Sequence, residues 1–158
     1  MARTPPIDPQ DPASARTAAV SLLARRDYAS GELRGRLEKK GFDHTIVDGT
    51  ILELLEQRVL DDARYAANYV SYHAERGEGP IRIEADLQAL GLPDDLIAAA
   101  LAAGPDWRVL AREVRLRRFG SAEPMESRER LRQARFLQYR GFSSDHIRSV
   151  IGAAFDLD

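Results

Sequence analysis

One motif recurs three times along the chain, about fifty residues apart. In each copy a leucine precedes a glycine by four positions, and apolar residues follow the glycine at matched positions. The aligned sets are Leu37, Leu87 and Leu137; Gly41, Gly91 and Gly141; Phe42, Leu92 and Phe142; Val47, Ile97 and Ile147; and Ile51, Leu101 and Ile151. This pattern is typical of a helix that ends at a glycine with positive φ and is followed at once by another helix. The repeat therefore predicts three copies of one small helical unit.

The middle copy indicates the helices of the unit. Asp61 is suited to cap a first helix, whose apolar residues recur at the spacing of one helical face. We expect Gly77 and Gly79 to end that helix. Pro80 then lies in the first turn of the next helix, where proline is best tolerated. In this copy the predicted order is helix, tight turn, helix.

The flanking copies follow the same plan. In the first, a helix starts at Ser14 and ends near Asp27, Ser30 caps a second helix, and Asp43 opens a third. The third copy has a longer loop, from Phe119 to Glu126, before its second helix. No stretch shows the period-two alternation of a strand.

We therefore predict an all-α fold, an elongated array of three tandem three-helix repeats. Each repeat is too small to bury a full core alone, so neighbours must pack against each other. Four prolines in a polar stretch predict a disordered leader. The expected division is a leader at 1–13 and repeats at 14–60, 61–104 and 105–158.

Composition excludes several classes of protein. The chain has no cysteine, so disulfides and thiolate metal sites are excluded. No apolar run is long enough to cross a bilayer, and the first residues lack a secretory signal. We expect a cytoplasmic protein, monomeric and without a membrane partner.

Charge is distributed unevenly although the net charge is only −2. Residues 61–104 hold three arginines and eight acids, a balance of −5, whereas residues 105–158 hold eleven arginines and eight acids, a balance of +3. Such polarity favours oriented binding to a charged partner. A merely solvated surface is the alternative.

No motif indicates catalysis. The three histidines, His44, His73 and His146, lack the spacing of metal ligands. The adjacent Asp61 and Asp62 are better explained by helix capping than by acid–base chemistry. The glycines near Pro80 lack the lysine and strand context of a phosphate-binding loop. We expect no enzyme activity, no metal and no cofactor.

Arginines recur at helical spacing in the last repeat. Arg108, Arg112 and Arg115 form one series, and a second comprises Arg128, Arg132 and Arg135. Apolar residues occupy another face of each helix, so both series are expected to point outward. Guanidinium groups bind carboxylates or phosphates through forked hydrogen bonds. The alternative is pairing on the helix surface with Glu113 and Glu129.

Several segments resemble the RecX family, whose members restrain the RecA recombinase. The resembling segments are Leu60-Asp61-Asp62, Arg64-Tyr65-Ala66, Arg76, Gly79-Pro80 and Ile83; Leu23-Ala24-Arg25-Arg26, Glu32-Leu33 and Lys40-Gly41-Phe42; and Arg118-Phe119-Gly120 and Leu137-Gln138-Tyr139-Arg140-Gly141-Phe142. The similarity spans nearly everything from residue 15 to 155. It implies tandem three-helix repeats that bind RecA filaments on single-stranded DNA and inhibit the RecA ATPase, filament extension and strand exchange.

A set of basic residues is expected to bind the partner or DNA. They are Arg25, Arg26, Arg34, Lys39, Lys40, Arg64, Arg76, Arg82, Arg115, Arg118, Arg132, Arg135 and Arg140. The expected partners are the RecA filament and single-stranded DNA, the latter weakly or through the filament. Two alternatives are a direct nucleic-acid-binding module of repeated helix-turn-helix type and an inert scaffold for another protein.

Overall fold

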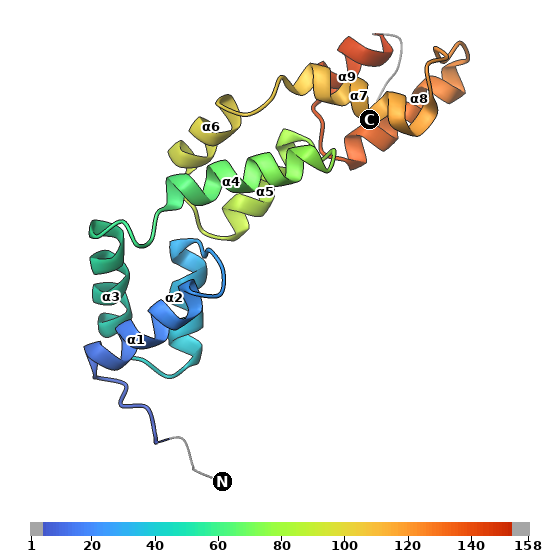
Figure 1. Ribbon diagram of the computed structural model, residues 1–158. Helices are drawn as coiled ribbons and strands as arrows, with labels where there is room; N and C mark the ends of the chain where they lie inside the picture. Colours follow the sequence, from blue (N-terminus) through green and yellow to red (C-terminus); the bar gives the residue numbers. More distant parts are fainter. Residues whose placement is uncertain (1–4, 153–158) are drawn as a thin grey trace. The chain divides into compact units, whose positions relative to one another are not determined.

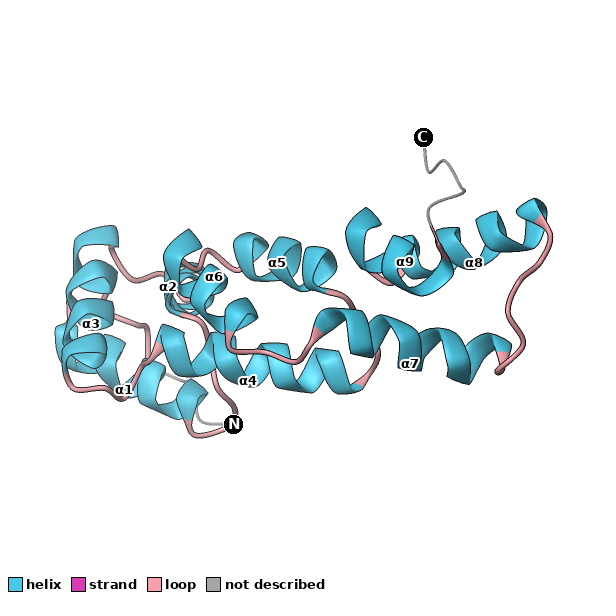
Figure 2. Cartoon of the chain, turned by 90° about the horizontal axis from the view of Figure 1, so that it is seen from above, coloured by secondary structure: helices cyan, strands magenta, loops and turns pink. Residues whose placement is uncertain are grey.

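The computed structural model describes residues 5–152, which form helices and loops (Figure 1). Over that range no residue is in a β-strand (Figure 2). The helices are α1 (Pro12–Leu23), α2 (Ser30–Lys39), α3 (His44–Glu56), α4 (Asp62–Glu75), α5 (Pro80–Ala89), α6 (Asp94–Ala102), α7 (Trp107–Phe119), α8 (Ser127–Tyr139) and α9 (Ser144–Ile151). The all-α prediction is confirmed, as is the longer loop between α7 and α8.

The chain divides into two compact units. The first contains the residues up to Tyr65 together with Leu90–Leu92, and the second contains Ala66–Ala89 together with the chain from Pro93 onward. The boundary therefore falls inside α4, whose first turn belongs to one unit and whose remainder belongs to the other.

The first unit is built on α1, α2 and α3, which pack against one another. Their apolar side chains form one buried cluster that includes Leu33, Leu37, Val47 and Leu54. Leu60, just before α4, is also buried in this cluster. The apolar stripes expected from helical spacing supply this core.

In the second unit, α5 packs on α6, and α7, α8 and α9 pack on one another. Ile83, Leu87 and Ile97 are buried on α5 and α6. A second cluster contains Leu137, Phe142 and other apolar residues of the last three helices, with Ala74 from α4.

The three repeat glycines all have positive φ. The φ angles are 103° at Gly41, 81° at Gly91 and 98° at Gly141. In the first copy, the amide of Phe42 donates to the carbonyl of Leu37, which is the bond expected of a Schellman stop. The third copy repeats this bond between the equivalent residues. The predicted helix stops are confirmed.

The N-terminus of α2 is capped differently from the prediction. Ser30 does not cap with its own side chain; instead its amide donates to Asp62 Oδ1 at 2.8 Å and its hydroxyl to Asp62 Oδ2 at 2.5 Å. The Asp62 side chain comes from the start of α4, and the residue is only 8% exposed. The expected capping of α4 by Asp61 is confirmed, since Asp61 Oδ1 accepts from the amide of Arg64.

Gly79 was expected to end α4, but α4 ends at Glu75 and Gly79 serves a different purpose. Its amide donates to the carbonyl of Arg140 at 2.7 Å, and the Ile81 amide donates to the carbonyl of Gly141 at 2.9 Å. A Cβ at Gly79 would lie 2.3 Å from the Gly141 carbonyl carbon. Gly79 is therefore needed for a close approach of two backbone segments.

The N-terminal stretch departs from the expected boundaries. Pro12 begins α1, inside the stretch expected to be a disordered leader, because Asp11 caps the helix and proline is tolerated in a first turn. The carbonyl of Pro9 accepts a hydrogen bond from the amide of Asp43. The Asp43 side chain does not cap α3; it accepts a hydrogen bond from Gln10. Residues 1–4 and 153–158 lie outside the described residues.

Candidate partner-binding surfaces

In the first unit, two of the candidate arginines are held by acids. Arg26 forms a forked pair with Glu32, at 2.8 and 3.1 Å, and stacks 3.7 Å from the centroid of the Tyr28 ring. The bond to Glu32 raises the pKa of Arg26 above its usual value. Arg34 Nε lies 3.1 Å from Asp48 Oδ1.

The other candidates of the first unit are solvent-exposed. Arg25 follows α1, Lys39 and Lys40 end α2, and Arg64 lies in the first turn of α4. Arg64 Nη2 donates to the carbonyl of Val59 at 3.4 Å, a long bond. These four cations are available to an acidic partner.

In the second unit, the prediction that Arg115 points outward is wrong. The residue is 5% exposed, its Nε donates to Gln133 Oε1 at 2.8 Å, and its Nη2 donates to the Ala122 carbonyl at 2.6 Å. Arg115, on α7, thus links that helix both to α8 and to the loop between the two helices. Arg108 and Arg112, the other members of the series, are exposed as expected.

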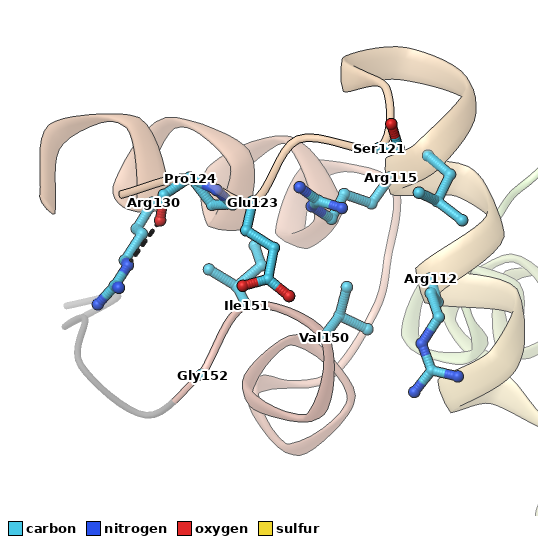
Figure 3. A pocket seen from close by; sticks show the side chains of 10 residues that line it. Arg112, Arg115, Ser121, Glu123, Pro124, Arg130, Val150, Ile151 and Gly152 are labelled. Atoms are coloured by element: carbon cyan, nitrogen blue, oxygen red, sulfur yellow. Dashed lines mark hydrogen bonds between the residues drawn. The ribbon is translucent and has the colours of Figure 1, made fainter. Parts of the chain in front are cut away.

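Arg115 also lines a pocket of about 380 Å³ beneath that loop (Figure 3). Arg130 holds the same loop by donating from Nε to the Pro124 carbonyl at 2.9 Å. Glu123, Val150 and Ile151 complete much of the lining. Two of the three arginines that line this pocket hold the loop by hydrogen bonds, and the third, Arg112, is exposed.

The second predicted series lies on α8. Arg128, Arg132 and Arg135 are exposed and line a shared shallow pocket with Glu126 and Glu129. Arg132 pairs with Glu129 at 2.9 Å, and the hydrogen bonds from Gln133 and Arg132 lower the pKa of Glu129. The prediction that these arginines point outward from α8 is confirmed, but the charge of Arg132 is neutralised by its pairing with Glu129.

Aromatic rings interleave with arginines along α7 and α8. Phe119 and Phe136 meet edge to face with centroids 5.3 Å apart. The Arg118 guanidinium lies 5.5 Å from the Phe119 centroid and 5.8 Å from that of Phe136. Arg132 lies 5.3 Å from the Phe119 centroid. These distances are within the range of cation–π attraction.

A similar stack lies at the end of α4. The Arg76 guanidinium lies 3.4 Å from the centroid of the Tyr72 ring, and Arg76 Nη1 donates to the Tyr72 carbonyl. Arg140 Nη2 donates to the carbonyl of Arg76 at 2.6 Å. Within residues 5–152, the ion-pair partner of Arg82, on α5, is the distant Glu78, at 3.7 Å.

The ends of α4 and α8 form, together with α7, a pocket of about 210 Å³, which we call the arginine pocket. Its lining residues are Arg76, Gly77, Val114, Arg117, Arg118, Phe136 and Arg140. Three of the predicted site residues, Arg76, Arg118 and Arg140, are thereby brought together from α7 and the ends of α4 and α8. No carboxylate is among the residues that line it.

Arg117, Tyr72 and Phe136 were not among the site residues expected from the sequence. A usable signal was an aromatic residue followed four positions later by an arginine, as in Tyr72 with Arg76 and Phe136 with Arg140. Such residues are neighbours on a helix surface. Nothing in the sequence brings the two pairs together.

The described part of the chain offers neither a metal site nor a membrane span. Among its residues, no group of three or more histidine, aspartate or glutamate side chains is placed to hold a metal ion. Within the same range, no helix combines the length and apolarity needed to span a membrane.

Three family models match the chain in order. The first three-helix domain of RecX matches residues 15–54, the second matches 61–101 and the third matches 109–151. The repeats recognised from spacing thus coincide with domains that recur in one family.

Curated relatives are similar over most of their length. The chain is 43% identical to the "Regulatory protein RecX" of Halorhodospira halophila, over 90% of this chain and 89% of that protein. It is 38% identical to the protein of the same name from Pseudomonas savastanoi, covering 90% and 92%, and 37% identical to that of Vibrio vulnificus, covering 94% of each.

Solved structures share the fold. A crystal structure of RecX from Lactobacillus salivarius matches with a TM-score of 0.79 at 20% identity, over 89% of this chain and 94% of that one. Another crystal structure of a regulatory protein RecX matches with a TM-score of 0.77 at 23% identity, over 88% and 72%.

Proposed function

This chain belongs to the RecX family of regulatory proteins, and from that premise we propose that it is a non-catalytic cytoplasmic regulator that binds RecA filaments on single-stranded DNA. By contacting neighbouring protomers it inhibits the RecA ATPase, filament extension and strand exchange. The observation that carries the proposal is the match of all three family domains in order along the chain.

The surface chemistry supports this proposal. A filament presents both acidic protein surface and a phosphate backbone, and this chain carries exposed cations in both units. Arg25, Lys39 and Lys40 are exposed in the first unit, while Arg118 and Arg135 are exposed in the second. Guanidinium and ammonium groups of this kind contribute to partner choice and association rate.

The test is the ATPase of the cognate RecA, measured on single-stranded DNA with increasing amounts of this protein. We expect progressive inhibition at substoichiometric to equimolar protein. No inhibition at several-fold molar excess would remove the proposal.

Direct reading of DNA by repeated helix-turn-helix units is the second candidate, and the acid-free arginine pocket favours some contact with nucleic acid. A direct reader should bind naked duplex tightly and with base preference. We expect weak binding to duplex at physiological ionic strength. Nanomolar, sequence-dependent binding to duplex would promote this candidate over the filament regulator.

A further inference from the structure

The arginine pocket combines a high positive charge with unused hydrogen-bonding capacity. It is lined by four arginines and no carboxylate. Neither Arg76, Arg118 nor Arg140 has an ion-pair partner among residues 5–152, and Arg117 has only the distant Glu113 at 3.7 Å. Like charges gathered at one site repel one another, so the cluster favours binding of an anion.

Arg140 supplies the most specific indication. Its Nε is buried and has no hydrogen-bond partner among the described residues, although its Nη2 is held by the Arg76 carbonyl. A buried donor without an acceptor costs free energy, so the guanidinium of Arg140 has hydrogen-bonding capacity that the surrounding protein leaves unused. The bond from Nη2 restrains the guanidinium group, so the side chain is held at the pocket before a ligand arrives.

The surroundings favour a phosphate group over a carboxylate. Tyr72, beside Arg76, is 53% exposed, and Phe136 lines the pocket itself. Arginines interleaved with aromatic rings suit single-stranded nucleic acids, because the cations bind the backbone while bases stack on rings and guanidinium planes. A carboxylate side chain would leave these faces unused.

We propose that the arginine pocket binds a backbone phosphate of a single-stranded nucleic acid, with the Tyr72–Arg76 stack as the adjoining surface for a base. Arg118 and Arg140 contact the phosphate oxygens, and Arg76 lies between phosphate and base. The proposal rests on the proposed function only for the source of the strand, which is the DNA of the RecA filament. Binding itself requires no RecA.

The test measures binding of a fluorescent oligothymidylate by anisotropy at low salt, without RecA. Arg118→Glu should weaken binding at least tenfold and lower the slope of log K against log salt by about 0.7 for each phosphate that the variant no longer binds. The matched control is Arg112→Glu, an exposed arginine on the same helix that lies outside the pocket. It should weaken binding less than threefold. Equal weakening in the two variants would show general charge attraction only and overturn the proposal.

Two further variants test the geometry. Arg118→Lys retains the charge but loses the fork, so it should bind several-fold more weakly than the wild type while folding identically. Tyr72→Leu should abolish photo-cross-linking of a bromouracil-containing strand at the end of α4. A wild-type cross-link located outside the pocket and the Tyr72–Arg76 stack would contradict the assignment.

The ATPase assay separates this inference from the proposed function. If Arg118→Glu binds the naked strand as well as the wild type but inhibits RecA at least tenfold less, the pocket holds a carboxylate of RecA and the phosphate assignment is wrong. If the wild type never slows the ATPase, yet strand binding depends on Arg118, the proposed function fails and the phosphate site stands.

Discussion

Single residues in this protein act over long sequence distances. Asp62 caps a helix that begins thirty-two residues earlier, and Arg115 on α7 bonds to Gln133 on α8, eighteen residues later. Both are charged residues with little exposure, and buried charges are tolerated only where hydrogen bonds compensate them. Their substitution should therefore affect stability more than that of exposed residues of the same type.

Asp62→Ala should lower the free energy of unfolding by about 2 kcal/mol, because it leaves the α2 terminus uncapped and two donors unpaired. Ser30→Ala removes only the hydroxyl bond and should cost about 1 kcal/mol. Urea denaturation followed by circular dichroism checks both values. The control is Asp94→Ala at an exposed helix start, which should change stability by at most about 0.5 kcal/mol. If the two substitutions lowered the free energy of unfolding equally, the cap formed by Asp62 would contribute no more than an ordinary exposed residue at a helix start.

His146 predicts a dependence of stability on pH. Burial and, secondarily, the nearby Arg108 lower the pKa of His146, despite the opposing effect of Asp145 and Asp106. Its Nδ1 is buried without a hydrogen-bond partner among the described residues. The folded state therefore favours the neutral ring, whereas the unfolded chain takes up a proton near pH 6.5. Stability contributed by the neutral ring should be lost as the pH falls below that value.

The measurement is thermal unfolding between pH 7 and pH 5.5, above the range in which ordinary carboxylates titrate. The melting temperature of the wild type should fall by more than that of His146→Gln, which has no proton to gain. Parallel curves for the two proteins would show that His146 does not contribute.

At the scale of elements, glycines determine how helices end and how closely they approach. Gly41 has positive φ with no atom near its missing Cβ, so its role is conformational. Gly79 has the opposite character, because the backbone of Gly141 occupies the space that a side chain would need. A similar contact occurs in the first unit, where a Cβ at Gly31 would lie 2.9 Å from the Leu90 carbonyl oxygen.

Gly79→Ala should therefore destabilise the second unit by about 2 kcal/mol or more, because the added methyl group separates α5 from the α8–α9 turn and breaks two backbone hydrogen bonds. Gly35→Ala is the matched control. It lies inside α2, where nothing beyond its chain neighbours and its own helix backbone lies within 4 Å of the added carbon, and it should stabilise the protein by about 0.5 to 1 kcal/mol. Denaturant unfolding measures both, and a neutral Gly79→Ala would contradict the close-approach argument.

At the scale of the whole molecule, charge is segregated along the chain, with an acidic middle and a basic end. Under the proposed function, such segregation would allow different regions of the chain to contact different surfaces of one filament. The exposed arginines of α8 are then expected to contribute to binding without contributing to folding, since exposed charges rarely change stability by much.

The double substitution Arg132→Glu and Arg135→Glu should leave the circular dichroism spectrum unchanged and weaken inhibition of the RecA ATPase at least tenfold, which corresponds to about 1.4 kcal/mol of binding free energy. Arg148→Glu, at an exposed position on α9, serves as the charge control. If the folded double variant inhibits as strongly as the wild type, the arginine face of α8 contacts solvent and does not contribute to binding.

The sequence by itself determined the class of fold, the number of repeats and the helix stops, because these depend on residues close together in the chain. A glycine that must adopt positive φ, as at Gly41 and Gly141, and a leucine four residues before it leave a local signal. The outward face of α8 was also predictable, since helical spacing separates Arg132 and Arg135 from the apolar stripe.

Only the tertiary structure decided which charged residues are bonded within the fold and which remain accessible to a partner. Arg115 has the same helical spacing as Arg112, yet it is buried because the loop carbonyl of Ala122 and the side chain of Gln133 are placed to receive it. Arg76, Arg118 and Arg140 line one pocket although they lie far apart in the chain. Hydrogen bonds and charge clusters of this kind depend on which helices and loops pack together in space, and helical periodicity carries no information about that.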